Sequence, residues 1–215
     1  MRTTVQIVDG RHTRSARTRA ALLDAAIEII CTDGVAAVTQ RAVAAKAGTS
    51  LASTTYHFRT ADDLLVAAFE ATSSRTIADM RRTAREAVER GAGIVDAAMA
   101  VVARAPYGDR LPPDGVVQLT LSAIHNPRLR PMAEAFVEEL AALFAPLTAS
   151  RDTARTLARS LSGLILHEMA RGADAPTATM RADVTRLFAA FGVPDHPTPG
   201  RPPADPPHHE DQEPR

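Results

Sequence analysis

Side chains that can read a nucleic acid crowd into one short stretch of the sequence, residues 50–58. Four of its first six residues carry hydroxyl groups, which can donate to or accept from base edges in a DNA groove. Tyr56 and His57 add groups that can donate to phosphate oxygens. The alternative is a hydroxyl-rich turn without a function, but serine and threonine are mediocre helix formers and here follow a defined turn. The stretch therefore predicts a DNA-reading helix.

Three short helices are predicted to position this stretch. Apolar residues three and four apart indicate a first helix over about 16–33, Thr39 caps a second over about 40–47, and a third covers about 50–57. The second and third are separated by a turn of three to four residues that contains Gly48. This is the spacing of a helix-turn-helix unit, although a generic helical corner shares it.

Residues around the third helix extend the predicted interface. Gln40 and Arg41 begin the second helix, within reach of phosphate or a base edge, and Arg17 can reach the DNA backbone or the minor groove. Leu51 and Phe58 are expected to anchor the third helix in a small core. The predicted DNA-contacting residues are Arg17, Thr39, Gln40, Arg41, Thr49, Ser50, Leu51, Ala52, Ser53, Thr54, Thr55, Tyr56, His57 and Arg59.

Charge is distributed unevenly along the chain, although Lys plus Arg and Asp plus Glu both total 25. Residues 1–60 carry eight basic and four acidic side chains, so this segment has a net charge of +4 and the remainder −4. A basic head on a mildly acidic body fits a nucleic-acid contact confined to one end. Ordinary fluctuation in composition would also produce a charge of this size.

Residues 39–58, with the leucine-rich segment after Thr60, resemble the DNA-binding segment of the TetR (tetracycline-repressor-like) transcriptional regulators. The shared pattern is a threonine-capped helix with a Val-Ala step, an Ala-Gly turn, and a short helix that ends in an aromatic cluster. The match is specific over about 16–70, and the rest agrees only in length and helicity. Many members have phosphate-contacting Tyr and Lys where this chain has Thr55 and Ala61. Tyr56, His57 and Arg59 are the expected substitutes for these phosphate contacts.

Together with the helical patterning, the resemblance implies an all-α fold of about nine helices in two parts. An N-terminal three-helix helix-turn-helix domain would bind DNA, and a C-terminal helical domain would bind a ligand and dimerise. The predicted divisions are a flexible arm at 1–14, a DNA-binding domain at 15–70 with its motif at about 39–58, an effector-binding and dimerisation domain at 71–192, and a disordered Pro-rich tail at 193–215.

Apolar stripes on the last two predicted helices indicate an interface or a core. Helices of the body are expected at about 61–78, 80–104, 113–125, 129–146, 151–172 and 177–191. The resemblance implies a homodimer in which the last two helices meet their symmetry mates, whereas the plain alternative is one monomeric bundle. The predicted dimer residues are Leu157, Leu161, Leu164, Ile165, Val184, Leu187, Phe188 and Phe191.

The resemblance also implies a ligand cavity inside the body. The predicted lining residues are Met99, Ile124, His125, Met132, Phe136 and His167, with Met80 and Val102 as further candidates. Methionine and aromatic residues at helical spacing are more often plain core, which is the competing interpretation of this set.

The sequence contains no motif typical of a catalytic or metal-binding site. His167 and Glu168 begin like a zinc-protease helix, but Arg171 stands where the second histidine belongs, and Cys31 alone excludes an internal disulfide or a Cys-based zinc finger. We predict no catalytic residue, cofactor, metal or membrane span, and a cytoplasmic location.

The sequence therefore predicts a DNA-binding transcriptional regulator. Its predicted form is a homodimeric repressor that binds a palindromic operator in double-stranded DNA and responds to a small-molecule effector of unknown identity. The alternative is a helical small-molecule-binding protein or enzyme with no DNA binding.

Overall fold

The computed structural model describes residues 5–104, 114–171 and 177–194. Within these ranges the chain forms nine α-helices, three short 3-10 helices and no strand, which confirms the predicted all-α fold. The α-helices are α1 (Val5–Asp33), α2 (Gln40–Lys46), α3 (Leu51–His57), α4 (Ala61–Glu89), α5 (Ile94–Arg104), α6 (Asp114–Ser122), α7 (Arg130–Phe144), α8 (Arg151–Ala170) and α9 (Ala178–Ala190). The 3-10 helices are η1 (Val35–Ala37), η2 (Pro127–Leu129) and η3 (Ala145–Leu147).

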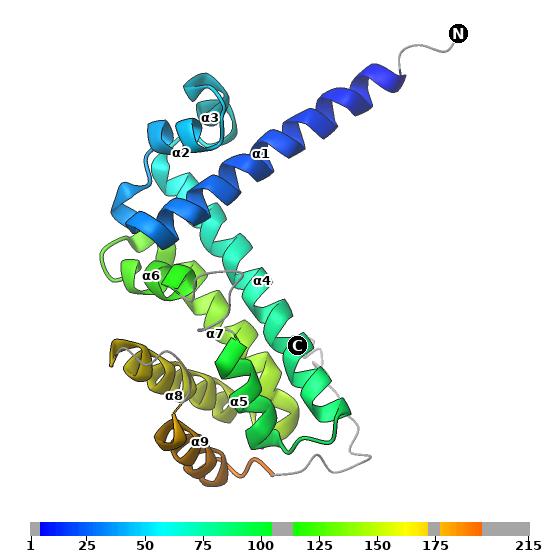
Figure 1. Cartoon of the computed structure of the whole chain (residues 1–215), viewed down its shortest axis with the longest axis vertical. Helices are drawn as coiled ribbons and strands as arrows, with labels where there is room; N and C mark the ends of the chain where they lie inside the picture. The colour runs from blue at the N-terminus through cyan, green and yellow to red at the C-terminus, as the bar shows by residue number, and fades with distance from the viewer. Residues whose placement is uncertain (1–4, 105–113, 172–176, 195–215) are drawn as a thin grey trace, which may run out of the picture.

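The long helix α4 connects the two ends of the molecule (Figure 1). At one end, α2 and α3 lie beside α1, whose N-terminal half projects away from the other helices. At the opposite end, α8 lies at the same height as α5 in this view, and α9 lies below α8 (Figure 1). None of the described helices is long and apolar enough to cross a lipid bilayer.

Side-chain caps begin the helices of the N-terminal end, and Thr39 is the predicted cap of the second helix. The Thr39 hydroxyl accepts a hydrogen bond from a backbone N–H in the first turn of α2, and the Ser50 hydroxyl does the same for α3. Thr60 and Asp63 form a reciprocal capping box at the start of α4, with bonds of 3.1 and 3.0 Å. Each cap satisfies backbone donors that the helix leaves unpaired, so the three starts are set locally.

The turn between α2 and α3 depends on Gly48, which has a φ of 62°. Its N–H donates to the Ala45 carbonyl at 3.2 Å, and the N–H of Thr49 donates to the Ala44 carbonyl at 2.9 Å. This pair of backbone hydrogen bonds ends a helix sharply and turns the chain within two residues. A residue with a Cβ would be strained in this left-handed conformation, so glycine fixes the angle of the helix-turn-helix unit.

The N-terminal helices share one hydrophobic core with part of the body. Its buried members from the first four helices include Leu22, Ile30, Val43, Leu64 and Phe69. Leu119 of α6 and Leu129 of η2 are completely buried in the same cluster. The body is therefore packed directly against the N-terminal helices through α6 and η2.

A second core fills the far end of the body. Leu157, Val184 and Phe188 are at most 2 % exposed and pack with residues of α5. The apolar stripes of α8 and α9 are therefore largely buried within the single chain.

Helix boundaries differ from the sequence prediction at three places. α1 begins at Val5, so residues 5–14 are helical where a flexible arm was expected, and no proline interrupts this segment. α4 continues without a break to Glu89, because residues 61–89 contain neither glycine nor proline, and the break falls at Gly91 with a φ of 83°. Val193 is buried in the second core, so it does not belong to the predicted tail. Residues 1–4 and 195–215 lie outside the described chain.

Candidate nucleic-acid interface and ligand cavity

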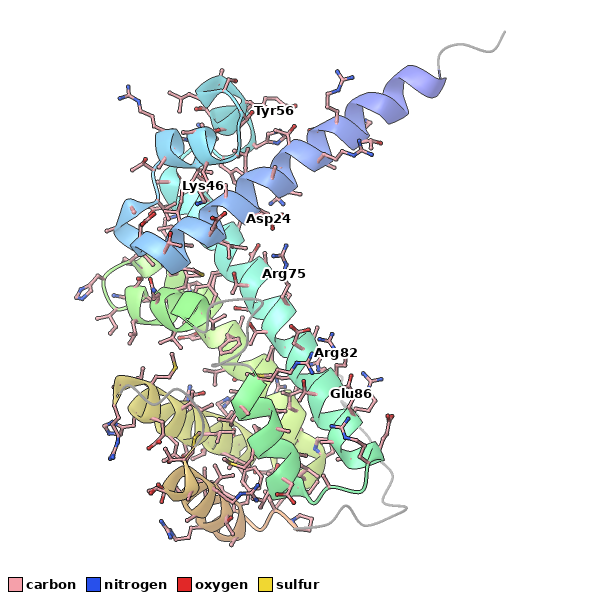
Figure 2. The ribbon with its side chains drawn as sticks, viewed as in Figure 1. Asp24, Lys46, Tyr56, Arg75, Arg82 and Glu86 are labelled. Atoms are coloured by element: carbon pink, nitrogen blue, oxygen red, sulfur yellow. The ribbon has the colours of Figure 1, made fainter. Side chains whose placement is uncertain are left out.

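The outer face of α3 presents a small group of uncharged side chains to solvent. Leu51, Ala52, Thr55 and Tyr56 are exposed, and Tyr56 is 81 % accessible. Figure 2 shows Tyr56 at the end of the molecule formed by α2 and α3. Apolar and methyl-bearing groups of this kind can contact thymine methyl groups, and the Tyr56 hydroxyl can donate to a phosphate or a base edge. The face therefore has the exposure that a groove-reading helix needs.

Two predictions for α3 are wrong. Thr54 is completely buried and donates its hydroxyl to the Ser50 carbonyl at 3.1 Å, so it cannot reach a base edge. Leu51 is 41 % exposed and does not anchor the helix. The anchor is Phe58, which is 4 % exposed and follows α3 in an extended conformation, with a φ of −139°. Because Phe58 lies outside the helix, its helical spacing from Leu51 does not put both residues on one face.

The hydroxyl groups of α3 are mostly occupied within the helix. Ser50 accepts from the N–H of Ser53 as the cap, and Thr55 donates to the Leu51 carbonyl at 2.9 Å. Thr55 keeps its methyl group and its acceptor lone pairs for an outside partner. Half-buried residues, namely Thr49, Ser53 and His57, line the edge of the exposed face.

Contacts from α1 and α2 hold the end of α3 in place. The amide of Gln40 donates from Nε2 to the Phe58 carbonyl at 2.7 Å, a part-buried bond between residues 18 apart in sequence. The Arg19 guanidinium lies 5.1 Å from the centre of the Phe58 ring, a cation–π distance. Gln40, predicted to touch DNA, is therefore a residue that also orients α3.

Exposed basic side chains occur on α1, on α2 and just after α3. Arg14, Arg17, Arg41 and Arg59 are exposed, and none forms an ion pair with a carboxylate in the described part of the chain. Thr39 is exposed as well, although its hydroxyl serves as the α2 cap. Lys46 is the exception among the nearby cations, because it pairs with Glu28 at 2.6 Å. Four arginines thus keep their charge available for phosphate groups.

The body contacts the start of α4 through polar bonds that the sequence did not predict. Arg128 donates to Asp63 at 2.6 Å and to the Thr60 hydroxyl at 3.4 Å, and Asn126 donates to Asp62 at 2.9 Å. The hydrogen bond from Arg128, followed by the one from Thr60, holds the pKa of the Asp63 carboxyl below its ordinary value. Asp63 consequently stays ionised while it closes the capping box.

A cavity of about 800 Å³ lies inside the body. It is lined by α4, α5, α6, α7 and α8, with Phe188 of α9, and its walls are overwhelmingly apolar. Polar residues are a minority of the lining, namely Thr72, Thr76, Arg81, Arg85, Glu89, Thr120 and Ser162. Thr72 is 2 % exposed, and its buried hydroxyl has no hydrogen-bond partner among the described residues. The size and lining are those of a site for a lipophilic small molecule.

The predicted cavity residues are only partly correct. Phe136, Met80 and Val102 line the cavity. Ile124 and His125 are exposed in the turn that follows α6, and His167 is exposed on α8. Met99 is buried in the second core and Met132 packs against the N-terminal core, so neither belongs to the lining. A helical stripe identifies a buried face but does not separate a filled core from an empty one.

Half of the predicted dimer residues are buried inside the protomer. Leu157, Leu161, Val184 and Phe188 are between 0 and 5 % exposed, so they cannot contact a second chain. The others, Leu164, Ile165, Leu187 and Phe191, are half-buried against the same core.

Comparison with known proteins places this geometry in a family. Residues 22–68 match the model of bacterial regulatory proteins of the tetR family. The multidrug binding protein EbrR, solved with imidazole, is 32 % identical, with a TM-score of 0.69 over 82 % of this chain and 94 % of that one. SCO1917 from Streptomyces coelicolor A3, a TetR-family member, is also 32 % identical, with a TM-score of 0.69 over 82 % and 98 % of the two chains. No curated protein sequence matches this chain. The likeness over most of both chains, together with the exposed helix-turn-helix face, means that the protein belongs to the tetR family of bacterial regulatory proteins.

Proposed function

We propose that the protein binds a palindromic operator as a homodimer, represses transcription there, and releases the DNA when an effector enters the cavity. The observation that carries this proposal is the exposed α3 face, together with four exposed arginines on α1, on α2 and just after α3 that form no ion pair in the described chain. Two such faces must lie about 34–36 Å apart to enter successive major grooves on one side of the DNA, which requires a second copy of the chain.

The cavity supports the ligand-responsive part of the proposal. EbrR has been solved with ethidium and with malachite green, and these chains align with this one over 82 % of its length. The apolar cavity of about 800 Å³ favours a lipophilic effector, because few groups in its walls can pair with a strongly hydrated ligand. The effector must prefer the non-binding conformation, since only a difference in affinity can shift the equilibrium.

Gel retardation with the DNA upstream of the protein's own gene tests the DNA-binding part. We expect specific retention that weakens steeply with salt, because phosphate contacts release counterions. Tyr56→Ala and Arg59→Ala should weaken retention, and Arg59→Ala should also lower the salt slope by about one. Arg159→Ala, an exposed arginine of α8 at the opposite end, is the matched control.

Two results would contradict the proposal. One is equal retention of operator and unrelated DNA by the wild-type protein. The other is a normal operator affinity of both α3 variants. Sedimentation of the free protein tests the dimer separately. A monomer at micromolar concentration would contradict the proposal that two α3 faces bind one operator.

A further inference from the structure

We infer that Arg128 is a positioning residue for DNA recognition: by clasping Asp63 and Thr60, it locks the η2 turn onto the start of α4 and holds α3 in its DNA-reading orientation. The inference rests on the proposed function and specifies the contact through which the body acts on the DNA-binding end.

The clasp consists of three bonds between segments distant in sequence. Arg128 Nη2 lies 2.6 Å from Asp63 Oδ1, Arg128 Nη1 lies 3.4 Å from the Thr60 hydroxyl, and Asn126 Nδ2 lies 2.9 Å from Asp62 Oδ1. The Asn126 side-chain oxygen also accepts from the Arg128 N–H at 3.0 Å, which orients the turn that carries the arginine. The guanidinium thus contacts both members of the α4 capping box.

This end of α4 is directly connected to the DNA-reading helix. One residue separates Thr60 from Phe58, the core anchor of α3. The Phe58 carbonyl is in turn bound by Gln40 of α2. A shift of Thr60 must therefore move Phe58 or strain that hydrogen bond, and both changes alter the orientation of α3.

The other side of the clasp leads to the cavity. η2 follows α6, where Thr120 and Leu121 line the cavity while Leu119 is buried in the N-terminal core. Arg130 donates to the Ala123 carbonyl at 3.3 Å and so ties the segment after η2 to the residue after α6. An occupant that displaces α6 must carry η2 with it, which would pull on the clasp.

A matched ion pair on α4 provides the control. Arg82 Nη2 lies 2.6 Å from Asp79 Oδ1, the same separation as in the clasp, and both pairs involve a half-exposed arginine. The Arg82 pair joins residues of one helix on the outer side of α4 (Figure 2), so it connects no two elements. Removing it changes surface charge and helix stability without releasing η2.

The experiment compares Arg128→Ala and Asp63→Asn with Arg82→Ala and Asp79→Asn in the full chain. Hydrogen exchange of the free protein should speed up at the α3 amides of the clasp variants only. Affinity for the upstream DNA should fall roughly twofold to thirtyfold in both clasp variants, with a double variant no weaker than the weaker single one.

Asp63→Asn separates positioning from charge. It removes a negative charge near the DNA, which alone would strengthen binding, and asparagine keeps an acceptor for the capping box. A weaker complex therefore supports the clasp. Unchanged α3 exchange in both clasp variants would overturn the inference, as would tighter DNA binding by Asp63→Asn. A salt slope reduced by about one in Arg128→Ala would overturn it too, because that indicates a direct phosphate contact.

The failure of the inference and that of the proposed function have different signatures. If the wild-type protein retains no DNA specifically, the proposed function fails, while the exchange measurement still tests whether the clasp restrains α3. If the wild type binds its operator and the clasp variants match it in both measurements, only the inference fails.

Discussion

Replacing Gln40 by alanine tests whether α3 is held in place by a single long-range hydrogen bond. The variant removes the 2.7 Å bond from Gln40 to the Phe58 carbonyl and leaves that part-buried acceptor without its partner. A neutral hydrogen bond contributes about 1 kcal/mol net, and an unpaired buried acceptor adds to the loss. We therefore expect the free energy of unfolding to fall by about 1–2 kcal/mol.

Thermal unfolding measures this loss directly. For a chain of this size each kcal/mol corresponds to roughly 2–4 °C in Tm, so the expected shift is several degrees. Arg41→Ala is the matched control, because Arg41 is the next residue, is exposed, and forms no ion pair in the described structure. Its free energy of unfolding should stay within about 0.5 kcal/mol of the wild type, so its Tm should hardly change.

DNA affinity completes the test. Both variants should bind the operator more weakly, but only Arg41→Ala should lower the salt slope, by about one, because only the arginine carries charge to a phosphate. A Gln40→Ala protein with wild-type Tm and weak DNA binding would refute the reasoning, since the glutamine would then act by touching DNA rather than by orienting α3.

Three further predictions concern the turn, the cavity and the clasp. Gly48→Ala should lower the unfolding free energy by about 1–2 kcal/mol because of its φ of 62°, whereas Gly163→Ala inside α8, with no atom within 4 Å of the new Cβ, should not destabilise in urea unfolding. A buried hydroxyl without a partner destabilises the folded chain by about 1–3 kcal/mol, and Thr72 carries such a group. Thr72→Val removes it and should therefore raise Tm. The folded-state pKa of Asp63 is lowered, so its stabilising contribution is complete above the unfolded value of about 4 and is lost as pH falls through the lower folded value. The Tm gap between wild type and Arg128→Ala should hold from pH 8 to 5 and close in strong acid.

Local signals made the DNA-binding end predictable from the sequence. Thr39, Ser50 and Thr60 each cap a helix within three residues of themselves, and Gly48 closes its own turn. The predicted break between residues 78 and 80 is wrong, because no glycine or proline interrupts residues 61–89 and the helix ends only just before Gly91.

Long-range contacts account for what the sequence could not predict. Phe58 leaves the helical register of α3 and is held from outside the helix by Gln40 and Arg19, so its spacing from Leu51 did not reveal that Leu51 faces outward. Apolar spacing in α8 and α9 predicts burial but not the partner, so core residues such as Leu157 were assigned to the dimer. Arg128 pairs with Asp63, 65 positions away in the sequence, and no local sequence pattern predicts such a contact.

The geometry of α4 explains why one chain can combine the two sites. Its first turn holds the capping box beside α3, while its residues from Thr72 onward line the cavity. A continuous helix transmits a displacement along its length, because its backbone hydrogen bonds resist bending and no proline or glycine interrupts residues 61–89. The coupling still needs a fixed point near the DNA-binding end, since a rod that is free at both ends can move without reorienting either. Under the proposed function, Leu129 in the N-terminal core and the Arg128 clasp would provide that point, so that movement in the cavity would rotate α2 and α3 rather than shift the whole chain.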